Sequence, residues 1–140
     1  MLEHVRKTYV FRLYPTPAQE TKLVQMLDTC RHVYNSLVHW RKHDYELFGH
    51  APNYYEQKKA LPLWKQTHPE LKEVHSQVLQ DVVRRVDLAF QAFFRRVNNG
   101  EEAGYPRLKG EGVYDSFTFT QSGYSVGETS ITLFRIGAVQ

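Results

Sequence analysis

Apolar residues in the first half of the chain recur at the three- and four-residue spacing of one face of an amphipathic helix. These positions are Leu23, Met26, Leu27, Cys30, Val33, Tyr34, Leu37 and Val38. A capping box marks the expected start, with Thr16 at the N-cap, Pro17 at the first helical position and Gln19 at the third. Gly49 is the expected end. The pattern predicts either one bent helix or two helices that break near Asp28.

Two further helical segments follow. Asn53 and Glu56 suggest another capped start, and we expect Pro62 and Pro69 to limit the next helices to short pieces. Ser76 is the expected cap of a strong helix that closes at an Asn-Asn-Gly run. The residues expected to face inward on that helix are Leu79, Val82, Val83, Val86, Phe90, Phe93, Phe94 and Val97.

Short stretches with strand character lie at both ends of the chain. Lys7 to Tyr14 is rich in aromatic and β-branched residues and is predicted as a strand that Pro15 stops. The later expected strands are Ser116–Thr120, Tyr124–Val126, Ser130–Leu133 and Ile136–Val139. This order predicts an α+β fold in which a helical bundle is inserted into a small antiparallel sheet or barrel. The N-terminal strand would pair with the C-terminal ones.

Composition narrows the class of protein. The chain has 140 residues with 41% hydrophobic and 14% aromatic content, which is enough to build a core and excludes an ordinary disordered tail. No apolar run approaches the roughly 18–20 residues that cross a bilayer, and the N-terminus lacks an apolar signal core. A single cysteine excludes an internal disulfide, so the expected location is a reducing cytoplasm. The net charge of +3 permits nucleic-acid binding without demanding it.

The residue types that usually carry catalysis or metal binding are present only in weak patterns. His39 and His43 are one helical turn apart, but no third ligand is nominated for a metal, so a partly exposed polar face is the favoured interpretation. Cys30 lies within the apolar stripe and is expected to be a core residue. Glu101 and Glu102 have the composition of a solvated loop. The sequence therefore predicts no catalytic residue and no metal site.

The basic residues are more informative, because two arginine pairs are eleven positions apart, about three helical turns. Such a row could follow a phosphate backbone. It could equally be a solvated face in which Asp81 and Asp87 pair with the arginines, and the residues alone do not separate these two readings. The candidate backbone-binding residues are Lys7, Arg12, Arg84, Arg85, Arg95, Arg96, Arg107 and Lys109.

Six motifs in a fixed order carry a family resemblance. They are FRLYPTPAQ (Phe11–Gln19), CRHVYN (Cys30–Asn35), AFQAFFRR (Ala89–Arg96), GYPRLK (Gly104–Lys109), SFTFTQ (Ser116–Gln121) and ITLFRIGAV (Ile131–Val139). Together they resemble the N-terminal part of the TnpB proteins, also called OrfB, of bacterial and archaeal transposons. Members of this family are RNA-guided DNA nucleases, and older descriptions give their first helices as a helix-turn-helix.

The resemblance implies a wedge domain, a small β-barrel, with a helical recognition domain inserted after its first strand. Residues 1–15 would hold the first wedge strand, residues 16–103 the recognition domain and residues 104–140 the remaining wedge strands. These domains would hold a guide RNA and read a short motif beside a double-stranded DNA target, in the bacterial or archaeal cytoplasm. The RuvC-like nuclease domain with its Mg²⁺ ions would follow, so we expect no catalysis by this chain and no cofactor besides the guide RNA.

The resemblance also nominates residues that read the DNA motif. They are Tyr54, Gln77, Gln80, Thr120 and Gln121. A glutamine side chain offers a donor and an acceptor together, which suits the major-groove edge of adenine. Tyrosine and threonine can contact a thymine methyl group or a phosphate.

Two alternatives remain beside the TnpB-like interpretation. One keeps the fold but makes the chain a stand-alone or repurposed DNA-binding regulator. The other is a helical scaffold that binds a protein partner through its aromatic surface.

Overall fold

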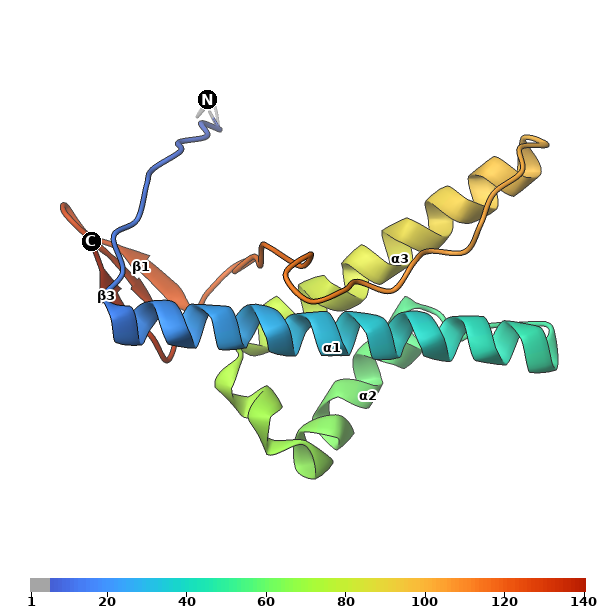
Figure 1. Ribbon diagram of the computed structural model, residues 1–140, viewed down its shortest axis with the longest axis horizontal. Helices are drawn as coiled ribbons and strands as arrows, with labels where there is room; N and C mark the ends of the chain where they lie inside the picture. Colours follow the sequence, from blue (N-terminus) through green and yellow to red (C-terminus); the bar gives the residue numbers. More distant parts are fainter. Residues whose placement is uncertain (1–5) are drawn as a thin grey trace, which may run out of the picture.

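The computed structural model describes residues 6–140 as a helical assembly with a small antiparallel sheet at one end (Figure 1). The helices are α1 (Pro17–Phe48), α2 (Tyr54–Thr67), the short 3-10 helix η1 (Pro69–Glu73) and α3 (Ser76–Asn98). The strands are β1 (Tyr124–Val126), β2 (Ile131–Leu133) and β3 (Gly137–Val139). The segment between α3 and β1 runs back along the helices from the far end of α3 to the sheet (Figure 1).

The predicted start and end of the first helix are confirmed. Gln19 N donates to Thr16 Oγ1 at 3.2 Å and Thr16 N donates to Gln19 Oε1 at 2.9 Å, which completes the capping box. Gly49, with φ of 76°, ends the helix in the left-handed region. Between these caps α1 is a single helix of 32 residues that continues through Asp28, so the alternative of two helices is wrong. Its buried stripe is Met26, Cys30, Val33, Tyr34, Leu37 and Val38, as predicted.

The second helix starts as predicted but is longer than expected. Glu56 N donates to Asn53 Oδ1 at 2.9 Å, within a complete capping box. Pro62 lies inside α2, which continues beyond it to Thr67, so the expectation that Pro62 would cut the helix short is wrong. A proline removes one backbone donor, but α2 continues through Pro62 and packs against α3 and η1. Pro69 does begin a separate short element, η1.

A buried polar network joins the three helices at their centre. Arg41 of α1 and Gln57 of α2 are both buried, and Arg41 Nε donates to Gln57 Oε1 at 2.7 Å. A second guanidinium nitrogen of Arg41 donates to Asp87 of α3 at 3.0 Å. Gln57 Nε2 donates to the carbonyl oxygen of Leu37 at 3.0 Å. Because buried polar groups are costly unless paired, this network fixes how the three helices meet.

The third helix differs from the prediction at both ends. Its N-cap is His75, whose Nδ1 accepts from Gln77 N at 3.1 Å, so the assignment of Ser76 as the cap is wrong by one residue. Most of the predicted inward positions are buried, but Phe94 and Val97 are 39% and 47% exposed. Their expected burial is therefore wrong, although the Phe94 ring still packs edge-on against Tyr45 of α1 with a centroid distance of 6.2 Å.

The sheet is open and antiparallel, in the order β1-β2-β3. Tyr124 is opposite Leu133 in the first pair, and Ile131 is opposite Val139 in the second. Val139 is fully buried. The strands at residues 124–126 and near residues 131–133 and 137–139 are confirmed within one residue at each predicted start. The fold is thus α+β, but the structure contains no closed barrel among residues 6–140.

The predicted N-terminal strand is absent. Lys7 to Tyr14 is not in a strand, and Tyr9, Val10 and Phe11 are 67%, 93% and 73% exposed. The edge of β3 that would receive this strand is used otherwise, because Gln19 Nε2 of α1 donates to the carbonyl oxygen of Ala138 at 2.7 Å. Only Tyr14 N reaches the end of the sheet, where it donates to the carbonyl oxygen of Gln140.

The predicted strand Ser116–Thr120 is also absent. The side chain of Arg85 takes the carbonyl oxygen of Ser116 and the hydroxyl of Thr118, at 2.8 and 3.1 Å. Phe117 and Phe119 still pack against the core, so the alternation marks buried positions without forming a ladder.

Within residues 6–140, no helix is both long and apolar enough to span a membrane. The proposed boundaries at residues 15 and 103 remain predictions.

Candidate nucleic-acid interface

Three of the five predicted motif-reading residues meet at the start of α3. Gln77 Oε1 accepts hydrogen bonds from Thr120 Oγ1 at 3.3 Å, from Gln121 N at 2.8 Å and from Ser122 N at 2.8 Å. The carbonyl of one side chain therefore fixes the turn that carries Thr120 and Gln121. The side chain of Gln121 is exposed, whereas that of Gln77 is half-buried and already engaged through its oxygen.

An aromatic cluster that the sequence analysis missed supports this turn. The ring of His75 packs edge-on against Phe119 and Phe134, with centroid distances of 5.9 and 5.1 Å. Gly123 has φ of 92°, and a Cβ there would lie 2.8 Å from both His75 and Phe119. The turn therefore needs a glycine and a flat ring at these positions. Gly123, directly before β1, marks the turn in sequence, but no local pattern links it to His75.

The other two predicted readers lie elsewhere. Gln80 is one turn farther along α3 and is half-buried. Tyr54 is in the first turn of α2, where its ring packs against Tyr55 and has Lys58 Nζ at 5.7 Å. In the described part of the chain no hydrogen bond joins either residue to the Gln77 turn. Their role in reading DNA remains a prediction, as does that of the other three.

Of the four arginines in the two pairs of α3, one is held by contacts within the chain and three have exposed side chains. Arg85 pairs with Asp81 at 3.0 Å and also donates to Tyr114 and Ser116, which attaches the returning segment to α3. Asp87 pairs with Arg41, not with a neighbour on its own helix. The three exposed side chains are Arg84, Arg95 and Arg96, and none forms an ion pair with another described residue.

Three of the predicted backbone-binding residues line one hollow. It has a volume of about 410 Å³ and is bordered by Arg96 of α3 and by Arg107 and Lys109 of the returning segment. Ala89 and Ala92 of α3 also line it. We call this feature the basic hollow. The structure thus brings together cations that are up to thirteen positions apart in the sequence.

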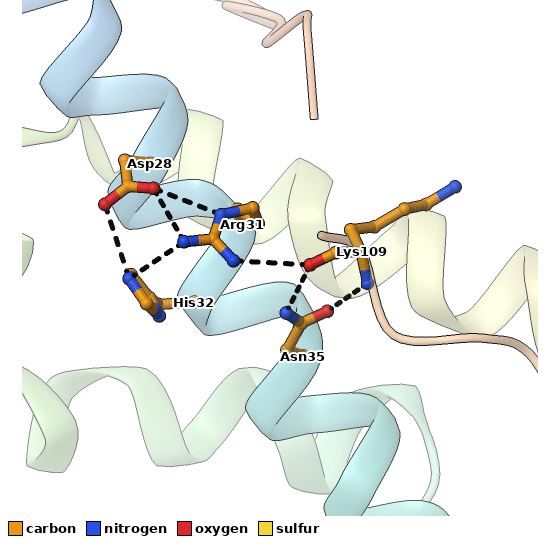
Figure 2. Close-up of polar contacts among 5 residues, drawn as sticks. All are labelled: Asp28, Arg31, His32, Asn35 and Lys109. Atoms are coloured by element: carbon orange, nitrogen blue, oxygen red, sulfur yellow. Dashed lines mark hydrogen bonds and ion pairs between the residues drawn. The ribbon is translucent and has the colours of Figure 1, made fainter. Parts of the chain in front are cut away.

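The backbone of Lys109, a residue that lines the basic hollow, is held by side chains of α1 (Figure 2). Asn35 of α1 donates from Nδ2 to the carbonyl oxygen of Lys109 at 2.9 Å and accepts from its N–H at 2.7 Å. Arg31 donates to the same carbonyl oxygen at 3.3 Å. Arg31 also pairs with Asp28 at 2.8 Å, and this hydrogen-bonded pairing lowers the pKa of Asp28. The sequence analysis missed Asn35, although it is the polar residue of the CRHVYN motif beside the buried stripe.

The remaining candidate cations lie apart from the basic hollow. Lys7 and Arg12 are exposed on the N-terminal segment, which leaves the molecule at the sheet end of α1 (Figure 1). The guanidinium carbon of Arg12 lies 5.6 Å from the ring centroid of Tyr14.

The titratable residues of the core do not suggest catalysis. Cys30 is fully buried, and this burial raises the pKa of its thiol to about 12, so it is a core residue as predicted. Burial also raises the pKa of Tyr114 to about 12. The His39 and His43 rings are 5.8 Å apart. Across residues 6–140 no group of three or more His, Cys, Asp or Glu side chains is placed to hold a metal ion.

Residues 1–50 match a helix-turn-helix domain family, HTH_OrfB_IS605. The chain is 29% identical, over 138 residues, to a protein of Streptomyces pristinaespiralis named as an RNA-guided DNA endonuclease; the match covers 96% of this chain and 33% of that protein. It is 27% identical, over 117 residues, to the protein of Escherichia coli K12 named as the RNA-guided DNA endonuclease InsQ, with 82% of this chain and 28% of InsQ covered. These matches support the resemblance of the chain to the N-terminal region of TnpB/OrfB proteins.

The chain spans about a third of the length of the curated relatives it matches. The segment matched by the helix-turn-helix family is, in residues 17–48, the single helix α1.

Proposed function

We propose that this chain is the nucleic-acid-binding part of a TnpB-type RNA-guided DNA endonuclease, that it holds guide RNA, and that it reads a short DNA motif beside the target. The names of the two relatives support the class of parent protein. The turn fixed by Gln77 supports the reading role.

The reading role rests on the different positions of Gln77 and Gln121 in that turn. Gln77 Oε1 holds the backbone of Gln121, so the backbone position of Gln121 is set before any DNA binds. The exposed side chain of Gln121 remains available, with one amide donor and one carbonyl acceptor directed by a fixed backbone. A bidentate contact to an adenine edge needs this combination. Gln121 is therefore the reader in this proposal, and Gln77 positions it.

The first experiment asks whether the chain carries nucleic acid. The chain is purified from its expressing cells, the ratio of absorbance at 260 and 280 nm is measured, and any copurified nucleic acid is sequenced. A single defined RNA is the expected result. DNA fragments without RNA would favour a stand-alone regulator, and a preparation free of nucleic acid that retains a protein partner would favour a scaffold.

The second experiment tests motif reading in a protein of the relatives' full length that contains this chain. Gln121→Ala is expected to lose about 1–3 kcal/mol of discrimination at one base position while guide-RNA affinity stays close to wild type. Gln66→Ala is the matched control, because Gln66 is an exposed glutamine on α2 outside the turn. Parallel loss of RNA and DNA binding, or a full base preference in Gln121→Ala, would contradict the reading role.

A further inference from the structure

The basic hollow differs in charge from the larger cavity of the molecule. Its lining contains Arg96, Arg107 and Lys109 and no carboxylate among the described residues. The larger cavity, of about 780 Å³, includes Arg31 in its lining and is lined by acids as well as bases. Its acidic residues are Asp28, Glu70, Glu73, Glu111 and Asp115. Of these two cavities among residues 6–140, the basic hollow is the one whose charged lining residues all carry the same sign.

No described residue neutralises the cations of the basic hollow through an ion pair. None of Arg96, Arg107 and Lys109 forms an ion pair with a residue in the described range 6–140. Three uncompensated cations around a concave surface raise the local concentration of anions. The small side chains of Ala89 and Ala92 leave room for such an anion to approach α3.

The aromatic rings that line the basic hollow already contact other side chains of the chain. Tyr105 stacks on Phe93 with a centroid distance of 4.9 Å, and Lys42 Nζ lies 5.5 Å from the Tyr105 ring. Lys109 Nζ lies 5.8 Å from the ring of Tyr34. A nucleobase would have to displace these contacts in order to stack, whereas a phosphate needs only the cations.

We propose that the basic hollow binds a phosphate of a nucleic-acid backbone, with Lys109 as a direct contact and Asn35 as its positioning residue. This inference rests on the proposed nucleic-acid-binding function and names the basic hollow as one site where the nucleic acid binds. Asn35 donates one hydrogen bond to the backbone of Lys109 and accepts one from it, and this pair fixes where the lysine side chain begins. The backbone phosphates of RNA and of DNA share this chemistry.

The direct test compares two lysines. Lys109→Ala removes an ammonium group at the hollow and leaves the Asn35 hydrogen bonds intact, since these go to backbone atoms. Lys59→Ala removes the same charge from an exposed position on α2 outside the hollow. Binding of the full chain to a labelled 20-nucleotide RNA, and separately to the matching DNA strand and duplex, is measured between 50 and 300 mM NaCl.

Lys109→Ala is expected to reduce the slope of log affinity against log salt by about 0.7 for single strands or about 0.9 for duplex. Lys59→Ala is expected to keep the wild-type slope. The nucleic acid whose slope changes identifies the source of the phosphate. Equal slopes for both variants and wild type, or equal reductions in both variants, would overturn the phosphate site.

Two further variants test whether binding needs the open volume of the hollow and whether Asn35 positions Lys109. Ala92→Leu fills the hollow without changing charge and is expected to weaken binding several-fold at constant melting temperature. Asn35→Ala keeps the ammonium of Lys109 but frees its backbone, and is expected to weaken wild-type binding while having little effect in the Lys109→Ala background. Additive losses for Asn35→Ala and Lys109→Ala would show that Asn35 does not act through Lys109.

The outcomes separate this inference from the proposed function. A wild-type chain that binds neither RNA nor DNA would contradict the function itself. A chain that binds nucleic acid with full affinity and slope after Lys109→Ala and Ala92→Leu would contradict the hollow alone.

Discussion

Gln77 Oε1, in the first turn of α3, accepts a hydrogen bond at 2.8 Å from the backbone N–H of Gln121, 44 positions later in the chain. The same oxygen accepts from Ser122 N and Thr120 Oγ1. One side-chain oxygen thus holds three consecutive residues of the turn. This contact ties the start of α3 to the approach to the sheet.

We predict that the carbonyl oxygen of Gln77, not its amide nitrogen, stabilises this turn. Gln77→Ala should lower the free energy of unfolding by about 1–2 kcal/mol, because each neutral hydrogen bond contributes about 0.5–1.5 kcal/mol. Gln77→Glu keeps an acceptor at the same place, and a carboxylate near a helix N-terminus is favourable, so its stability should match wild type. Urea denaturation of both variants provides the measurement. Equal losses in the two variants would show that the turn does not depend on an acceptor here.

Arg85 is predicted to act as a structural anchor. Its guanidinium donates to Asp81, to the Ser116 carbonyl oxygen and to Thr118 Oγ1, at 3.0, 2.8 and 3.1 Å. Arg85→Ala should cost about 1.5–3 kcal/mol of unfolding free energy, since hydrogen bonds to charged groups are the stronger ones. Amide hydrogen exchange should accelerate in the segment around residue 116.

Arg84→Ala is the stability control for this substitution. Arg84 is exposed on the same helix, so its loss should change the free energy of unfolding by less than about 0.5 kcal/mol. If both arginine variants lose the same stability, the anchoring role of Arg85 is wrong.

Stability should fall at high pH because of the buried acidic groups. Burial raises the pKa of Cys30 from 9.0 to about 12 and that of Tyr114 from 10.0 to about 12. Below pH 9 both groups are protonated whether the chain is folded or not. Between pH 9 and 12 the unfolded chain releases these protons while the folded chain keeps them, so stabilisation of the folded state is lost as pH rises.

Denaturation midpoints measured from pH 7 to 11 check this dependence. Cys30→Ala should remove the part of the decline that begins near pH 9 and leave the part that begins near pH 10. An unchanged onset in Cys30→Ala would exclude the thiol as its source.

We predict that the chain alone does not cut DNA. Two-metal phosphodiester cleavage needs carboxylates that hold two ions about 4 Å apart. No such acidic group occurs among residues 6–140. Supercoiled plasmid incubated with the chain and Mg²⁺ should stay intact, as it does with EDTA. Mg²⁺-dependent nicking that disappears on mutation of one of its own acids would contradict the prediction.

The helices were predictable because their signals are local. Thr16 with Gln19 and Asn53 with Glu56 are each three residues apart, and both capping boxes form as the sequence indicates. His75 was missed as the cap of α3 because histidine is a rare N-cap, and its ring is held there by Phe119 and Phe134 from a distant segment.

The strands were less predictable because a strand is defined by its partner. Lys7 to Tyr14 has strand composition, but Gln19 from α1 occupies the Ala138 carbonyl oxygen on the edge it would use. Ser116 and Thr118 alternate correctly, yet Arg85 takes their oxygens. Side-chain competition for backbone acceptors cannot be seen in a pattern of apolar and polar residues.

In the candidate site, too, single residues were predictable but the contacts between distant segments were not. The family resemblance nominated Gln77, Thr120 and Gln121 separately, and only the fold shows that the first holds the other two. Asn35 could not be found from the chemistry of nucleic-acid binding, because its contacts are to the backbone of Lys109 and not to a ligand.

If the chain binds nucleic acid as proposed, the continuity of α3 sets the length of nucleic acid that both ends of this helix can contact. Gln77 and Arg96 lie on one unbroken helix, and a rise of about 1.5 Å per residue separates them by about 28 Å along its axis. At about 3.4 Å per step this is the length of about eight base pairs. An oligonucleotide much shorter than this reaches one end of α3 only, whereas a longer one can engage both ends and gain from the high effective concentration of the second contact. The affinity for an oligonucleotide should therefore rise abruptly when its length reaches about eight base pairs, because the length of α3 sets the distance between the two contacts.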